Sequence, residues 1–167
     1  MLKLNLTNLF VKQKELDKKI HIEHKVNYKK VVKDLKLALF VELSELANEI
    51  RCFKFWSYKK ASPKNAILEE YVDGIHFITS LCIFYKTSSQ FAITWPQTKF
   101  KSKQEITNEL LKLFELSKTL LDSNETLHNW YQKYLIFGFK LGFSQKEIIG
   151  AYNKKKLINF KCQTQKY

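Results

Sequence analysis

Two short acidic motifs hold the residues of this chain that are best suited to chemistry. Glu42 and Glu45 form one pair, Glu70 and Asp73 form the other, and the members of each pair are three positions apart. In a helix, side chains at that spacing share one face, and apolar residues flank both motifs. Four carboxylates on core-facing helices would repel one another and lose their hydration without a counter-charge. Mg²⁺, with Mn²⁺ as the alternative, suits this place because it prefers carboxylate oxygens and retains waters for a phosphate substrate.

A short break in the sequence between the motifs allows the two helices to pack antiparallel, so that their acidic faces meet. A metal ion held there would bridge phosphate oxygens, neutralise a leaving pyrophosphate and lower the pKa of an attacking water. Glu49 and Glu69 are further carboxylates nearby. Either could accept the proton of that water, although Glu69 more simply belongs on a solvated face. The alternative interpretation is two solvated helix faces, because Glu pairs at this spacing are common.

The composition favours helices as the elements that position these motifs. Gly (4) and Pro (2) are scarce among 167 residues, which disfavours a turn-rich β fold. The length indicates one domain over residues 1–167 with a sizeable core. The pattern of apolar residues shows no convincing strand and predicts a compact all-α bundle of about six helices, with the metal site between two antiparallel acidic helices. The clearest loop covers residues 87–101, and the expected helices cover about residues 7–20, 28–52, 63–86, 103–121, 126–141 and 145–160.

Local start and stop signals agree with these helices. A Ser or Thr before a helix can accept hydrogen bonds from its first backbone N–H groups, and a Glu three residues later can return the bond. Glycine after a helix adopts the left-handed conformation that ends it. The signals are Thr7 as a cap, Ser62 followed by Pro63, the capping boxes Ser102–Glu105 and Ser144–Glu147, and Gly142.

The net charge of +13 raises nucleic acid or an anionic surface as a partner. The lysines are spread along the chain instead of forming one block, and Arg51 is the single arginine. A solvated basic surface is therefore favoured over a dedicated nucleic-acid site. Such a surface would still steer a substrate that carries several phosphates.

Cysteine usage and hydropathy indicate a cytoplasmic protein without a membrane partner. Cys52, Cys82 and Cys162 are odd in number and lack metal-binding spacing, which indicates free thiols in a reducing compartment. Charged residues interrupt the N-terminal apolar stretch, so it does not have the pattern of a cleavable signal. The longest apolar run, Ile75–Tyr85, contains polar residues and is too short to span a bilayer.

Three residues near the acidic motifs are candidate substrate contacts. His76 follows Asp73 by three positions, and it is either a hydrogen-bonded core histidine or a substrate contact. Lys54 and Trp56 lie just beyond the first acidic helix. Trp56 either packs in the core or stacks on a base, an interaction worth about 1–3 kcal/mol.

Both ends of the chain carry further polar residues at helical spacing. Gln13 and Asp17 lie four apart near the start. The last stretch is either a frayed basic tail or a wall whose Lys and amide groups meet phosphates and a base. Its residues in question are Tyr152, Lys155, Asn159, Gln163 and Tyr167.

Taken together, these motifs resemble the dimeric all-α dUTP diphosphatases, which are relatives of the MazG-type nucleotide pyrophosphohydrolases. The similarity covers nearly the whole chain, and the stretch Asp73-x-x-His76-Phe77 is among its most specific parts. It is carried by Leu9, Phe10, Gln13, Leu16 and Asp17, by Glu42–Glu49, by Phe53–Trp56, by Glu69–Phe77, and by Leu141–Phe143 with Ala151, Tyr152, Lys155, Asn159, Gln163 and Tyr167.

The resemblance implies Mg²⁺-dependent hydrolysis of dUTP to dUMP and pyrophosphate by a homodimer whose sites lie near the subunit interface. A water polarised by a carboxylate, with Glu45 as the first candidate and Glu49 as a spare base, would attack the α-phosphorus. The implied metal ligands are Glu42, Glu45, Glu70 and Asp73. The implied substrate contacts are Lys155 at the phosphates and Gln13, Trp56, His76 and Asn159 around uracil and deoxyribose. Lys54, Tyr152 and Gln163 remain further candidate substrate contacts.

Three positions near the end depart from the family pattern. The family usually has Asn, Arg and Gly where this chain has Lys156, Cys162 and Lys166. A guanidinium missing at position 162 removes a bidentate phosphate contact, for which Lys156 or Lys161 could substitute as point charges. Two other hypotheses stay open: a relative that acts on another nucleoside triphosphate such as dCTP, and a basic helical protein that binds nucleic acid or a partner after losing its catalytic function.

Overall fold

The computed structural model describes residues 2–93, 96 and 98–164. Within them the chain forms six α-helices, one short 3-10 helix and two strands, which confirms the predicted all-α bundle. In chain order the elements are β1 (Leu2–Asn5), α1 (Thr7–Glu23), α2 (Tyr28–Ile50), α3 (Lys64–Phe84), β2 (Gln90–Ile93), α4 (Lys103–Leu116), η1 (Ser117–Thr119), α5 (Asn124–Lys140) and α6 (Gln145–Thr164).

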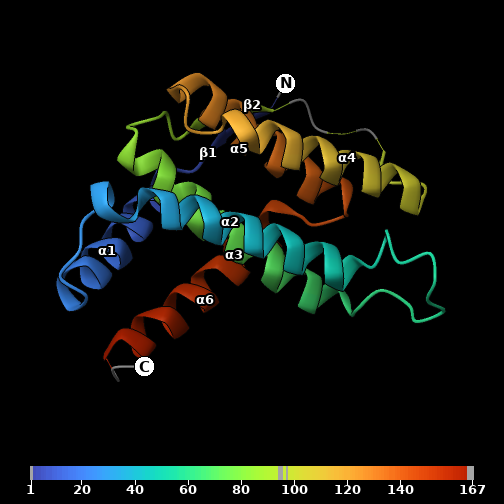
Figure 1. Cartoon of the computed structure of the whole chain (residues 1–167), viewed down its shortest axis with the longest axis horizontal. Helices are drawn as coiled ribbons and strands as arrows, with labels where there is room; N and C mark the ends of the chain where they lie inside the picture. The colour runs from blue at the N-terminus through green and yellow to red at the C-terminus, as the bar shows by residue number, and fades with distance from the viewer. Residues whose placement is uncertain (1, 94–95, 97, 165–167) are drawn as a thin grey trace.

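Helix α3 lies at the centre of the bundle. It packs against α1, α2, α5 and α6, and a helix with neighbours on several sides must be apolar around most of its circumference. Its buried residues accordingly include Leu68, Val72, Ile75, Ile78 and Leu81. In Figure 1, α2 and α3 lie side by side, with α4 and α5 on one side of the pair and α6 crossing on the other.

Helix α2 is amphipathic, and its apolar stripe sets the orientation of its acidic residues. Leu39, Leu43, Leu46 and Ile50 recur every three or four positions and are buried. This spacing places them on one face of the helix, as expected for a helix that packs along another. Glu42 and Glu45 immediately precede Leu43 and Leu46, and they therefore lie at the edge of the interface with α3.

A pair of tyrosines connects α3 to α5. The Tyr71 hydroxyl donates to the backbone oxygen of Tyr134 at 3.1 Å, and the Tyr134 hydroxyl donates to the backbone oxygen of Tyr71 at 3.0 Å. The two rings stack with centroids 4.7 Å apart. A Cβ at Gly74 would overlap the ring of Tyr134, and one at Gly138 would overlap the ring of Tyr71. The absence of a side chain at these two glycines is therefore what lets the rings lie against the opposite helix.

The prediction that the chain contains no strand is wrong. β1 and β2 form an antiparallel pair in which Leu4 lies opposite Phe91, and β2 occupies part of the expected loop 87–101. Phe91 and Ile93 are buried, whereas the two residues that alternate with them are exposed. A run of four residues is too short for such alternation to stand out in a sequence, and each strand depends on a partner far along the chain.

Two predicted helix caps are wrong, although the helices begin close to where they were expected. Thr7 does not cap α1; instead its backbone N–H donates to the side chain of Asn5 at 2.9 Å. Ser62 does not cap α3, which begins after Pro63 without a side-chain cap. The Ser62 N–H donates to the backbone oxygen of Glu49 at 2.9 Å. This bond connects the incoming segment to the end of α2.

The other local signals are confirmed. The Ser102 hydroxyl accepts from the backbone N–H of Glu105 at 3.2 Å, although the Glu105 carboxylate binds the N–H one residue before the cap. Ser144 and Glu147 exchange bonds in both directions, and Gly142 has a φ of 93°. Three expected helix ends were less accurate: α1 continues past residue 20, α4 gives way to η1 before residue 121, and α6 continues past residue 160.

We predict that Gly138→Ala lowers the free energy of unfolding by roughly 1–3 kcal/mol, because the new methyl group must displace the Tyr71 ring. Gly150→Ala is the matched control: apart from its chain neighbours and the nearby backbone of its own helix, no atom lies within 4 Å of a Cβ there. Ala is preferred over Gly inside a helix, so this change should raise the same free energy by up to about 1 kcal/mol. Urea denaturation measures both, and equal stability of the two variants would contradict the packing described.

Candidate functional site

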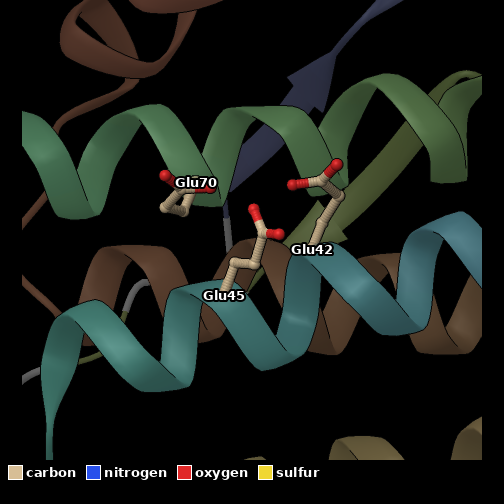
Figure 2. A group of neighbouring side chains, drawn as sticks. All are labelled: Glu42, Glu45 and Glu70. Carbon is tan, nitrogen blue, oxygen red and sulfur yellow. The ribbon is translucent and has the colours of Figure 1, made fainter.

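Three of the four predicted metal ligands come together between α2 and α3. Glu42 and Glu45 extend from α2 toward α3, where Glu70 lies opposite them (Figure 2). Carboxylate oxygens from the three residues lie within 4.8 Å of one another. Glu45 is exposed, whereas Glu42 and Glu70 are half-buried. One cation could therefore touch all three carboxylates and still remain open to a ligand from solution.

Two carboxylates of this cluster, those of Glu42 and Glu70, resist ionisation. Burial, followed by the negative charges of Asp73, Glu45 and Glu70, raises the pKa of Glu42 to about 7. Burial, then Asp73 and Glu45, also raises the pKa of Glu70 above its usual range, while Lys155 acts in the opposite direction. Like charges a few ångströms apart in a partly desolvated place favour the protonated form. A divalent cation would reverse this balance, and a set of hard oxygen donors fits Mg²⁺ or Mn²⁺ better than a soft metal.

The fourth predicted ligand, Asp73, is engaged elsewhere. Its carboxylate forms an ion pair with the ammonium group of Lys155 on α6 at 2.6 Å. Burial raises the pKa of Asp73, whereas the hydrogen bond and charge of Lys155 lower it. Lys155 is thus a built-in counter-charge for this side of the cluster, since it also lowers the pKa of Glu42.

A cavity of about 380 Å³ adjoins the cluster and shares Glu42 with it. Its wall is built from α1, α2, α3 and α6, which the fold brings together at one end of the α2–α3 pair. Volumes of this size accommodate small organic ligands. Among the residues predicted to bind substrate, those in the wall are Gln13, His76, Lys155, Asn159 and Gln163.

Gln13 is the centre of a buried hydrogen-bond network in this wall. Its Oε1 accepts from the hydroxyl of Tyr152 at 2.6 Å and lies 2.8 Å from Nδ1 of His76. Its Nε2 donates to Asp17 at 2.8 Å and to Ser80 at 3.0 Å. The Tyr152 ring stacks on the His76 ring with centroids 4.1 Å apart. Tyr152 therefore supports the cavity from behind.

His76 is neutral. Burial, with a contribution from the positive charge of Lys155, lowers its pKa to about 3, and the backbone of Tyr152 acts weakly in the other direction. Only 5% of the residue is exposed. A neutral imidazole carries one N–H and one lone pair, so His76 offers one donor and one acceptor and no charge.

Asp17, Ser80 and Tyr28 belong to the same network, but the sequence analysis did not assign them to the site. Asp17 is buried and also accepts from Ser80 at 3.0 Å and from the Tyr28 hydroxyl at 2.6 Å. The spacing of four between Gln13 and Asp17 was the available signal. Nothing local marks Ser80 or Tyr28, because their roles come from the packing of α3 and α2 against α1.

The end of α6 contributes Cys162 to the cavity wall. Lys156 does not face the cavity; it pairs with Glu15 at 2.7 Å. Gln163 lies 2.8 Å from the His24 ring through its Oε1. Tyr167 and Lys166 lie outside the described residues.

Three predicted residues are not brought to the cavity. Lys54 and Trp56 belong to the segment between α2 and α3, which projects at the far end of the pair from α1 (Figure 1). Trp56 is 63% exposed and packs edge-on against Phe55. Glu49 lies one turn beyond Glu45 on α2 and is not one of the three clustered carboxylates.

The fold and the site together define an all-α protein with a carboxylate cluster next to a ligand-sized cavity, an arrangement suited to a metal-assisted hydrolase. The family model for dUTPase matches residues 5–167, and the chain therefore belongs to the all-α dUTPase family. That family places it among the nucleotide pyrophosphohydrolases. No curated protein matches the chain. Among the residues that the structure describes, no helix is both long and apolar enough to cross a membrane.

We predict that metal-free Glu42→Gln is more stable than the wild type at pH 8. The folded-state pKa of Glu42, about 7, lies above its ordinary 4.5. The protonated Glu42 carboxyl therefore makes its full contribution to the free energy of unfolding below about pH 4.5, and this contribution is lost as the pH rises through 7. Part of this carboxyl stays in contact with water, which weakens the effect. The free energy of unfolding of Glu42→Gln relative to wild type should therefore be roughly 1 kcal/mol higher at pH 8 than at pH 5.

Thermal unfolding in buffer with a chelator measures this difference. Glu69→Gln is the control, because Glu69 is exposed and lies outside the clustered three; it should show no such pH dependence. If Glu42→Gln were more stable than wild type by the same amount at both pH values, the raised pKa of Glu42 would be contradicted.

Proposed function

We propose that the protein hydrolyses dUTP to dUMP and pyrophosphate with the help of Mg²⁺. The observation that carries the proposal is the convergence of three carboxylates beside a cavity whose wall contains neutral hydrogen-bonding groups and Lys155. Membership of the dUTPase family supports the same reaction. The carboxylates suit the triphosphate end of the substrate, and the cavity suits the nucleoside end.

In this proposal Glu42, Glu45 and Glu70 hold the metal, and Mn²⁺ is the alternative ion. When bound, the metal supplies Lewis-acid stabilisation of the phosphate charge. Asp73 becomes a fourth ligand if Lys155 moves from its carboxylate to a phosphate oxygen. The position of Lys155, which borders both the cavity and Asp73, supports this exchange.

The chain's own residues account for the rest of the reaction. Glu45 is exposed and can accept a proton from a water that attacks the α-phosphorus, and Glu49 is a second candidate for this role. The new bond joins the water oxygen to the α-phosphorus, and the bond to the bridging oxygen of pyrophosphate breaks. Asn159 and Gln163 offer amide groups to the nucleotide from α6.

We further propose that the protein works as a homodimer. The segment between α2 and α3 exposes 92% of Phe55 and 63% of Trp56, and clustered apolar side chains this exposed are typical of an interface. In a homodimer, Lys54 and Trp56 of one protomer could lie against the site of the other, which would give these two residues the substrate contact predicted for them.

The three free cysteines are compatible with a cytoplasmic location.

The reaction is tested by release of pyrophosphate from dUTP, dCTP, dTTP, dATP and dGTP, with Mg²⁺ and with a chelator. We predict metal-dependent turnover of dUTP with little turnover of the others. Equal turnover of several substrates would support a broader nucleoside triphosphate pyrophosphohydrolase. Absence of turnover together with salt-sensitive DNA binding would support a basic binding protein instead.

In the same assay, Glu45→Gln should lower kcat for dUTP by at least about 100-fold while leaving the fold intact, because the clustered carboxylate and proton acceptor is lost. Glu69→Gln, one position before the cluster residue Glu70, is the matched control and should keep wild-type turnover. Unchanged activity of Glu45→Gln would remove the cluster from the mechanism.

The homodimer is tested by sedimentation equilibrium. The double substitution of Phe55 and Trp56 by Ser should shift the wild-type dimer toward monomer, because both exposed aromatic side chains are lost from the proposed interface. Ile22→Ser is the control, since Ile22 is equally exposed but lies on α1. A wild type that is monomeric at micromolar concentration would contradict the proposal.

A further inference from the structure

One ring nitrogen of His76 lacks a hydrogen-bond partner in the part of the chain that the structure describes. Nδ1 of His76 lies 2.8 Å from Gln13 Oε1, whereas Nε2 is shielded from solvent and has no hydrogen-bond partner among the described residues. Most buried polar atoms in proteins are paired, and an exception calls for an explanation. His76 belongs to the cavity wall, so a bound ligand is a natural source of the missing partner.

The orientation of the Gln13 amide decides which nitrogen of His76 carries the proton. Asp17, when ionised, has only acceptor oxygens, and one of them lies 2.8 Å from the Gln13 side chain. The amide must therefore turn its NH₂ group toward Asp17, because the reverse orientation would place a carbonyl oxygen against a carboxylate. This leaves Oε1 facing His76, and an oxygen acceptor requires a proton on Nδ1.

In this network, all donors and acceptors of the Gln13 side-chain amide are already used. Its two N–H groups point to Asp17 and Ser80, and its oxygen accepts from Tyr152 and His76. An amide has two donors and two oxygen lone pairs, so its capacity is full. Gln13 is also only 3% exposed. In this structure it can act on a ligand only through His76.

We propose that Asp17 is a positioning residue that, through Gln13, holds His76 as the Nδ1–H tautomer and so makes Nε2 an acceptor reserved for an N–H or O–H donor of the ligand. The inference that this acceptor favours uracil over cytosine rests on the proposed function. Uracil carries a hydrogen on N3, whereas cytosine has a lone pair there. A wall acceptor at this position therefore favours the uracil edge and opposes the cytosine edge.

The tautomer is tested first, without substrate. Nitrogen-15 NMR of the ligand-free protein separates protonated from unprotonated ring nitrogens, and His76→Gln identifies the His76 signals among the four histidines. The expected result is a protonated Nδ1 and an unprotonated Nε2. A protonated Nε2, or a signal averaged over both nitrogens, would overturn the inference whatever the enzyme activity.

The role of Asp17 is tested by variants. Asp17→Leu removes the acceptor that orients Gln13, and mixed His76 tautomers are expected. Asp17→Asn should rescue the Nδ1–H form, because its carbonyl oxygen can still accept from Gln13. Ser80→Ala is the matched control: it removes one bond to Gln13 and one to Asp17 but keeps the Asp17 carboxylate that accepts from Gln13, so it should leave the tautomer unchanged.

If Asp17→Leu does not fold, Gln13→Met takes its place. It breaks the connection between Asp17 and His76 and should give the same loss of the Nδ1–H preference. An unchanged tautomer in a folded Asp17→Leu or Gln13→Met variant would overturn the role of Asp17.

The base preference is tested by the ratio of kcat/KM for dUTP to that for dCTP. Asp17→Leu should lower this ratio by at least about tenfold, with most of the loss in dUTP, while Ser80→Ala should keep it. An unchanged ratio in a variant with mixed tautomers would overturn the part of the inference that concerns the base. A protein that turns over no deoxynucleotide would overturn the proposed function and the base preference; mixed tautomers in its Asp17→Leu variant would still support the role of Asp17 in fixing the tautomer.

Discussion

Three carboxylates lie between α2 and α3, and the packing of these two helices must hold them together against their mutual repulsion. Glu42, Glu45 and Glu70 lie close enough that burial and mutual repulsion raise the pKa of Glu42 and Glu70. A fold that served stability alone would place these side chains apart, because each half-buried carboxylate near another costs free energy. The apolar stripe of α2 and the nearly all-round apolar surface of α3 hold the two helices together in spite of that repulsion.

Helix α6 connects this charged region to the cavity. Through Lys155 it places a cation against Asp73, and through Tyr152 it supports the neutral network around Gln13 and His76. The site thus has a charged part, built for oxygen anions, and a neutral part, where hydrogen-bond direction matters more than charge. The desolvation that opposes ionisation of Glu42 also keeps His76 neutral, so one physical cause produces both parts.

Patterns within one helix could be predicted from the sequence, whereas contacts between helices, apart from the meeting of the two acidic motifs, could not. Glu42 and Glu45 share a face because the helical repeat requires it, and the capping pair Ser144–Glu147 is local in the same way. The ion pair of Asp73 joins α3 to α6, and no spacing rule links residues so far apart. Trp56 illustrates the converse: its neighbours in the chain suggest a site residue, but its position depends on where the segment after α2 projects. The four-residue strands escaped detection because their alternation is shorter than the window in which it becomes significant.

The reciprocal contact of Tyr71 and Tyr134 has a consequence for how this chain can change over evolutionary time. Each ring occupies the space left by a glycine on the facing helix, so positions 71, 74, 134 and 138 form two interlocked pairs. A larger residue at either glycine is tolerable only if the ring opposite becomes smaller, and that change removes a bond to the other helix. Substitutions at these four sites should therefore occur in concert across related sequences, even though none of the four is part of the carboxylate cluster.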